Sequence, residues 1–332
     1  MTVRCPSTAQ EETVPSGAAV PFGSAVPSAP AAPPADRRVA ALSPQKQALL
    51  DALRAGRGRT AAPPAARGTL VELHPGTDRG AEAVVLCPPI GGGVFCYTGL
   101  ARLLAGRRPV LAVAAEERPE ETATVESMAE GYFALLAAAG ARPAVLAGWS
   151  FGGLVAYEAA RRLASAGAAA PVVLLDTMSW PDSVPAWDGP ATLQRFVADL
   201  VDSAGPADAL PGGGDRLPVD PAVWRLPPDE ALDAAVAALR THGIDLGLDG
   251  IDLTIRHAGY RVATRAMQAH VPGPYAGPVT LLHAEDSAVD PAEWRARVSG
   301  PLHLRPVPGG HYDVVREPAV RTAAELIRAA AP

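Results

Sequence analysis

Short apolar runs and longer amphipathic segments alternate along the chain from about residue 69. Each run is bounded by Gly or Pro and is too short for a buried helix, which is typical of a strand covered on both faces. The predicted strands are TLVELHPG (69–76), AEAVVLCPP (81–89), RPVLAVAA (108–115), ARPAVLAGWS (141–150) and APVVLLDT (170–177). The predicted helices between them are YTGLARLLAG (97–106), VESMAEGYFALLAAAG (125–140) and GLVAYEAARRLASAG (153–167). This alternation with short links predicts an α/β fold with a mostly parallel sheet and helices on both faces.

The alternation stops between about residues 180 and 270, where apolar residues recur at helical spacing instead. We expect a helical insertion here, with its segments joined by a stretch rich in Gly and Pro. The expected helices are TLQRFVADLVDSAG (192–205), PDEALDAAVAALRTHG (228–243) and GIDLTIRHAGYRVATRAMQAH (250–270). Two more strands, GPVTLLHAED (277–286) and LHLRPVPGGH (302–311), then complete the sheet before a last helix over 317–330.

The first 68 residues have a different character. Residues 1–38 are rich in Ala, Pro, Ser and Gly and offer little apolar surface to bury, which predicts a disordered tail. A short amphipathic helix is expected over 42–54, with Ser43 as its N-cap and Pro44 at its first position. A flexible linker over 57–68 would then connect this helix to one domain over 69–332.

Composition excludes several functional classes. The net charge of −6 and the lack of a Lys/Arg-rich run argue against nucleic-acid binding. No run of about 18 apolar residues would span a membrane, and prolines interrupt the N-terminal segment where a signal peptide would need an apolar core. Three cysteines make no disulfide framework, and no His/Cys cluster has metal-ligand spacing. We therefore expect a cytoplasmic protein with no metal and no cofactor.

The motif Gly148-Trp149-Ser150-Phe151-Gly152 carries the first sign of chemistry. A predicted buried strand leads directly into it and a predicted helix leaves it, so Ser150 would lie at a sharp strand-to-helix turn. The two glycines allow close backbone approach, and the helix N-terminus offers N–H groups to an anion. This context predicts a nucleophilic serine, whereas an ordinary serine N-cap is the alternative.

A serine nucleophile needs a positioned base, and in α/β-hydrolases the chain order is Ser, acid, His. His311 follows the last predicted strand, where that order places the base. The acid is open between Asp176, at the end of the strand after the nucleophile helix, and Asp286, at the end of the next one. Either carboxylate could orient the imidazole and stabilise its protonated form.

An oxyanion hole is expected from two backbone N–H groups. Phe151, directly after the nucleophile, would supply one. The loop CPPIGGG (87–93) would supply the other from Ile90, the first residue there after two prolines that lack an N–H, with Gly91 as the alternative. The loop lacks the spacing of a phosphate-binding motif.

These residues resemble the thioesterase domains that release products from nonribosomal peptide and polyketide synthases. The similarity covers about residues 69–332 and is carried by AGWSFGGLVAYEAA (147–160), VLCPPIGGGVFCYTGLARLL (85–104), GYRVATRAMQAHVPGPYAGPVTLLHAE (259–285) and PGGHYDVVREPAV (308–320). Cys87 departs from the pattern, because many members have His there. In chain-terminating members the acid follows the strand after the nucleophile helix, so the resemblance favours Asp176 and the terminating type; in editing members it more often lies near Asp286.

The resemblance implies that Ser150 attacks an acyl or peptidyl thioester on the phosphopantetheine arm of a carrier protein. Water would then release an acid, or an internal amine or hydroxyl a lactam or lactone, under a lid formed by residues 180–270. No carrier motif precedes the domain, so we expect a carrier protein acting in trans, with the helix over 42–54 either as a docking element or as a tethered surface helix without that role. An editing thioesterase, a general serine esterase or lipase, and a non-catalytic carrier-binding protein remain alternatives.

Overall fold

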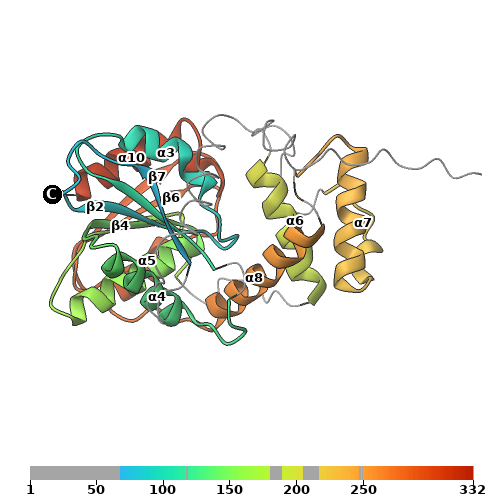
Figure 1. Ribbon diagram of the computed structural model, residues 1–332, viewed down its shortest axis with the longest axis horizontal. Coiled ribbons are helices and arrows are strands. Elements are labelled where there is room, and N and C mark those ends of the chain that lie inside the picture. Colours follow the sequence, from blue (N-terminus) through green and yellow to red (C-terminus); the bar gives the residue numbers. More distant parts are fainter. Residues whose placement is uncertain are drawn as a thin grey trace, which may run out of the picture.

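A twisted sheet of seven strands forms the centre of the part of the chain that the structure describes (Figure 1). This part, in a computed structural model, comprises residues 68–116, 119–179, 189–204, 217–246, 248 and 250–331. The strand order is β1-β3-β2-β4-β5-β6-β7. The strands are β1 (Thr69–His74), β2 (Ala83–Cys87), β3 (Val110–Ala114), β4 (Pro143–Trp149), β5 (Val172–Leu175), β6 (Val279–Ala284) and β7 (Leu302–Val307). Within it, β1 pairs antiparallel with β3 and the other pairs are parallel, which confirms the predicted α/β fold.

The four central strands are buried along nearly their whole length, because helices cover both faces of the sheet. Helices α3 (Thr98–Leu104) and α10 (Ala319–Ala330) lie on one face (Figure 1). Helices α4 (Val125–Ala138) and α5 (Phe151–Ser165) lie on the other. Each face has its own apolar core, so the short apolar runs of the sequence match the doubly covered strands.

The chain between β5 and β6 forms the helical insertion, defined here as α6 (Gly189–Ala204), α7 (Pro228–Thr241) and α8 (Gly250–Ala269). Figure 1 shows it beside the sheet, with α8 nearest to it. At the end of α8, His270 Nδ1 lies 2.9 Å from Glu126 Oε1 on α4. The insertion has a separate apolar core that includes Phe196, Trp224 and Leu239. Its helices therefore pack on one another as well as on the sheet.

Some predicted segments lie outside the described residues. They are the helix over 42–54, the tail and linker before residue 68, and residues 205–216 of the Gly/Pro-rich stretch.

The structure also contains a short helix that was not predicted, α9 (Pro291–Arg297), which follows β6. The sequence signals for this helix span only two residues: Asp290 caps its N-terminus by accepting from Ala292 N–H, and Pro291 occupies its first position. No helix within the described ranges is long and apolar enough to cross a membrane.

Candidate active site

Ser150 lies in the tight turn between β4 and α5. Its backbone has φ 57° and ψ −129°, a conformation that costs a residue with a side chain on the order of 1–3 kcal/mol. Its side chain does not cap α5, so it does not serve as an ordinary N-cap. The Ser150 N–H donates to the Leu175 carbonyl at 2.9 Å, which fastens the turn to the end of β5. Ser150 lines the cavity described below.

Glycine is required on both sides of this turn by close backbone contact. A Cβ on Gly148 would lie 2.2 Å from the backbone of Gly152. A Cβ on Gly152 would lie 2.4 Å from the carbonyl oxygen of Cys87 at the end of β2. The spacing of the motif therefore follows from the crossing of α5 over the ends of two strands.

His311, which follows β7, contacts the carboxylate of Asp176. Its Nδ1 lies 2.7 Å from Asp176 Oδ2. Because an ionised carboxylate can only accept hydrogen bonds, Nδ1 donates and Nε2 remains available as an acceptor. His311 is partly exposed toward the same cavity as Ser150. An imidazole held in this way can act as a general base toward a hydroxyl that comes within hydrogen-bond reach of Nε2.

Asp176 is held rigidly. Its side chain is 0% exposed, and its Oδ1 accepts from Ala284 N–H and from the Ser287 hydroxyl, both at 2.8 Å. Its backbone φ is 46°, which turns the chain directly after β5. The other candidate acid, Asp286, is exposed, and its backbone N–H donates to the Gly309 carbonyl at 3.0 Å. The structure thus brings Asp176, rather than Asp286, to His311.

Aromatic side chains support the histidine. The indole of Trp149 stacks on the His311 ring, with centroids 5.0 Å apart, and the Tyr312 ring lies edge-on to His311 at 5.3 Å. The Tyr97 hydroxyl bridges two strand ends, because it donates to Cys87 O at 2.6 Å and accepts from Trp149 N–H at 2.8 Å. The sequence did not predict the contacts that Tyr97 and Tyr312 make at the site. For Tyr312, its position directly after His311 was the one feature of the sequence that could have indicated a role there.

The residues expected to supply the oxyanion hole lie near the nucleophile. Phe151 is the first residue of α5, so its N–H belongs to the helical turn whose N–H groups have no partner within the helix. Ile90 lines the cavity and lies in a turn closed by a 2.8 Å hydrogen bond from Gly92 N–H to Pro89 O. Two N–H donors of this kind can stabilise a developing oxyanion.

A cavity of about 450 Å³ lies between the sheet and the helical insertion, within the usual size of small-ligand sites. Ser150 and His311 open into it. Its apolar lining includes Ile90, Met178, Phe196, Leu200 and Met267. Its polar lining, beyond Ser150, His311 and Asp176, includes Arg195, Asp199, Arg256, Tyr260 and Tyr312. The lining therefore suits a largely apolar group that also presents polar atoms.

Cys87 and Cys96 are free thiols beside the site. Burial raises the pKa of each thiol to about 12, so both stay protonated near neutral pH. Neither is an activated nucleophile. Across the described residues, no group of three or more His, Cys, Asp or Glu side chains is arranged to hold a metal ion.

Comparisons with known proteins agree with this fold. Residues 82–214 match the model of the thioesterase domain family. A solved four-domain nonribosomal peptide synthetase, holo-AB3403 bound to AMP and glycine, is 26% identical with a TM-score of 0.66, over 79% of this chain and 20% of that one. The Vlm2 thioesterase domain has the same fold at 20% identity and a TM-score of 0.52, over 79% of this chain and 97% of that one.

Curated relatives point the same way. Orsellinic acid synthase ArmB of Armillaria ostoyae is 28% identical over 202 residues, which is 59% of this chain. The non-reducing polyketide synthase PKS16 of Cladonia grayi is 29% identical over 179 residues, or 53% of this chain. The chain spans 8% of the length of each of these two relatives. Taken with the fold and the site, these matches show that residues 82–214 are similar to the thioesterase domain family and that the chain has the α/β-hydrolase fold of the thioesterase domains in nonribosomal peptide synthetases.

Proposed function

We propose that this thioesterase releases an acyl or peptidyl chain from the phosphopantetheine arm of a carrier protein through an acyl–Ser150 intermediate. One observation carries the proposal: Ser150 and the His311–Asp176 pair line the same cavity, to which the helical insertion also contributes lining residues. A thioester carbonyl bound in that cavity would lie beside a serine, a base and the start of a helix. Those are the groups that acyl transfer requires.

The first half of the proposed reaction forms the acyl-enzyme. His311 Nε2 takes the proton from the Ser150 hydroxyl as its oxygen attacks the thioester carbon. The N–H groups of Ile90 and Phe151 stabilise the oxyanion, and Asp176 stabilises the imidazolium. The C–S bond then breaks, and His311 returns the proton to the leaving phosphopantetheine thiol.

The second half releases the chain. Water, or an amine or hydroxyl of the acyl chain itself, gives its proton to His311 and attacks the acyl–Ser150 ester. The ester C–O bond then breaks, and His311 returns the proton to the Ser150 oxygen. The apolar lining contributed by Phe196, Leu200 and Met267 would hold the acyl chain while the ester is attacked. An acid leaves when water attacks, and a lactone or lactam leaves when the chain attacks itself.

The decisive experiment compares one acyl group presented on a separate carrier protein with the same group as a small soluble ester. We expect a much higher kcat/KM for the carrier-bound form, and a Ser150 adduct in the intact-protein mass. Ser150→Ala should abolish both, whereas Ser165→Ala, on the exposed end of α5, should retain them. Equal efficiency on the soluble ester would refute the carrier-dependent function and favour a general esterase. A competent carrier supplied as a separate protein would also support the prediction that it acts in trans.

A further inference from the structure

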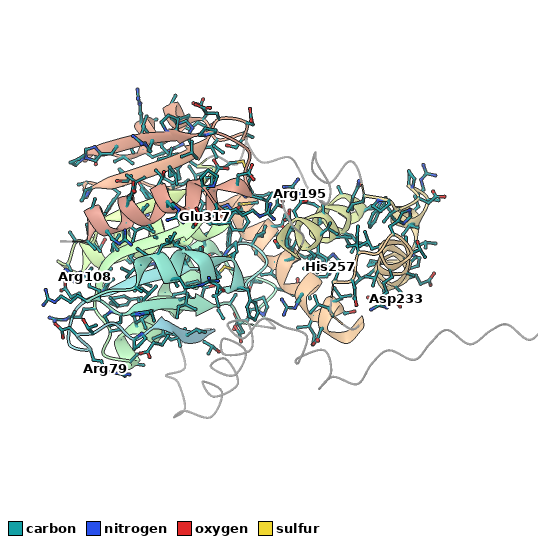
Figure 2. The ribbon with its side chains drawn as sticks, turned by 90° about the horizontal axis from the view of Figure 1, so that it is seen from above. Arg79, Arg108, Arg195, Asp233, His257 and Glu317 are labelled. Atoms are coloured by element: carbon teal, nitrogen blue, oxygen red, sulfur yellow. The ribbon has the colours of Figure 1, made fainter. Side chains whose placement is uncertain are left out.

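Asp199 of α6 makes a polar junction between the helical insertion and the loop that carries His311. Its two carboxylate oxygens accept from the hydroxyls of Tyr312 and Tyr260. Arg195, one helical turn earlier, places its Nε 3.1 Å from Asp199 Oδ1. Figure 2 shows Arg195 where the helical insertion meets the sheet. Among these three partners, Tyr312 is the one that lies outside the insertion.

The polar junction is largely shielded from water. The Asp199 side chain is 18% exposed, so its charge depends on these partners for compensation. Burial, and then the negative charge of Asp199, raises the pKa of Tyr312 and of Tyr260 well above the usual range. Both hydroxyls therefore keep their protons and donate. Burial, with Asp199 as the next cause, also raises the pKa of Asp202 on the same helix.

Tyr312 extends the junction to the proposed base. It follows His311 directly in the chain, and its ring lies edge-on to the rings of His311 and Trp149, at 5.3 and 5.5 Å between centroids. A second contact reinforces the first, because Arg316 donates to the backbone carbonyl of Asp202 on α6. The Arg316 guanidinium also lies 5.9 Å from the centre of the Tyr312 ring. Helix α6 is thus fastened to the His311 loop at two places.

We propose that Asp199 is a positioning residue, which holds His311 in alignment through Tyr312 and so couples catalysis to the placement of α6. The inference rests on the proposed function, because it gives Asp199 a role only if His311 activates Ser150. A carboxylate that served only to pack the insertion could be satisfied by Arg195 and Tyr260. An apolar contact would hold α6 at a lower desolvation cost, whereas a hydroxyl on a charged acceptor fixes direction.

The test separates alignment of His311 from substrate binding. Tyr312→Phe removes the hydroxyl, and Asp199→Asn leaves one accepting oxygen for two tyrosines. A small fluorophosphonate reports the reactivity of Ser150 without a carrier or an acyl chain. We expect each variant to label about 10- to 100-fold more slowly and to lose kcat on a carrier-bound substrate by a similar factor, with KM little changed. The double variant should be no slower than the worse single one, because both changes break the same bond.

Matched variants exclude a purely structural effect. Tyr275→Phe removes another buried hydroxyl, which donates to Ala170 O at 2.6 Å away from the cavity; it should lower the Tm but not the labelling rate. Tyr260→Phe should slow labelling less than Tyr312→Phe. The proposal is overturned if the Tyr312 and Asp199 variants label at the wild-type rate, or if Tyr260→Phe slows labelling as much as Tyr312→Phe. Failure of the wild-type protein to label would instead refute the nucleophile assignment of the proposed function.

Discussion

The indole Nε1 of Trp149 donates to the backbone carbonyl of His311 at 3.0 Å, while the two rings stack at 29° between their planes. The residue directly before Ser150 thus contacts the residue proposed to activate that serine, although 162 positions separate the two in the chain. The Trp149 side chain, at the end of β4, therefore connects the nucleophile turn to the loop after β7 by a hydrogen bond and ring stacking.

Trp149→Phe tests this relationship, since it keeps an aromatic ring but removes the indole N–H. The loss of one partly buried hydrogen bond is about 1 kcal/mol, which corresponds to roughly a fivefold fall in kcat if the bond aligns His311. Steady-state kinetics on a carrier-bound substrate measures the change. Trp224→Phe, in the separate core of the helical insertion, is the control and should affect kcat less. Wild-type kcat in Trp149→Phe would mean that stacking alone suffices.

Paired amide substitutions identify the acid. Asp176→Asn removes the charge that accepts from His311 Nδ1 and favours the wrong tautomer, so kcat should fall by about 10³- to 10⁴-fold. Asp286→Asn changes an exposed carboxylate and should cost far less. Circular dichroism would verify that both variants are folded, and single-turnover acylation would measure the loss. A larger loss in Asp286→Asn would reverse the assignment.

Substitution at Gly148 should deform the nucleophile turn. The Cβ of Gly148→Ala would meet the Gly152 backbone at 2.2 Å, so the chain must shift, at a cost of about 1–3 kcal/mol in unfolding free energy. Ser150 labelling should slow as well, because the turn moves. Gly99→Ala is the matched control, since a Cβ there meets nothing within 4 Å in helix α3. Urea unfolding and probe labelling measure both effects; equal stability of the two variants would contradict the prediction.

Much of the sheet and of the nucleophile turn could be predicted because their signals are local. Continuous apolar runs mark strands covered on both faces, and the Gly148–Gly152 spacing marks the turn around Ser150. The residues alone leave the acid open between Asp176 and Asp286, since both end predicted strands and chain order admits either; the family resemblance is what favours Asp176. Two features of Asp176 distinguish it from Asp286: its positive backbone φ, and its burial with a hydrogen bond from the last residue of β6. Neither feature has a sequence signal.

The junction at Asp199 could not be predicted for a different reason. Asp199 and Tyr312 lie 113 positions apart, and an Asp on a helix face has the appearance of an ordinary solvated residue. The separate core of the insertion also has no sequence mark, because an apolar helix face does not reveal whether it packs on the sheet or on other helices. Long-range polar contacts of this kind become visible only once the insertion is placed.

Acid should weaken the helical insertion through His257 on α8. This side chain is 8% exposed, its Nε2 has no hydrogen-bond partner in the described residues, and burial followed by the charge of Arg261 lowers its pKa to about 4 from 6.5. Between pH 6.5 and 4 the unfolded chain binds a proton at His257 that the folded chain does not, so the free energy of unfolding falls as pH falls.

His257→Leu should therefore lose less stability than the wild-type protein when the pH is lowered from 7 to 5. Urea unfolding at the two pH values measures the difference, and His303→Leu, at an exposed position on β7, serves as the control. Parallel pH dependences for the wild type and His257→Leu would show that the buried imidazole is not the group that titrates.

The helical insertion leaves the sheet after β5 and returns to it at β6, and these two strands are neighbours in parallel register. Its length and sequence can therefore change between relatives without moving a strand or the residues at the strand ends. The part of the chain that would select the acyl group and the part that would react with it can thus diverge at different rates. If our inference is correct, the contact between residues 199 and 312 is where the helical insertion and the catalytic residues cannot change independently. A substitution at one of these two positions should then be accompanied by a compensating substitution at the other.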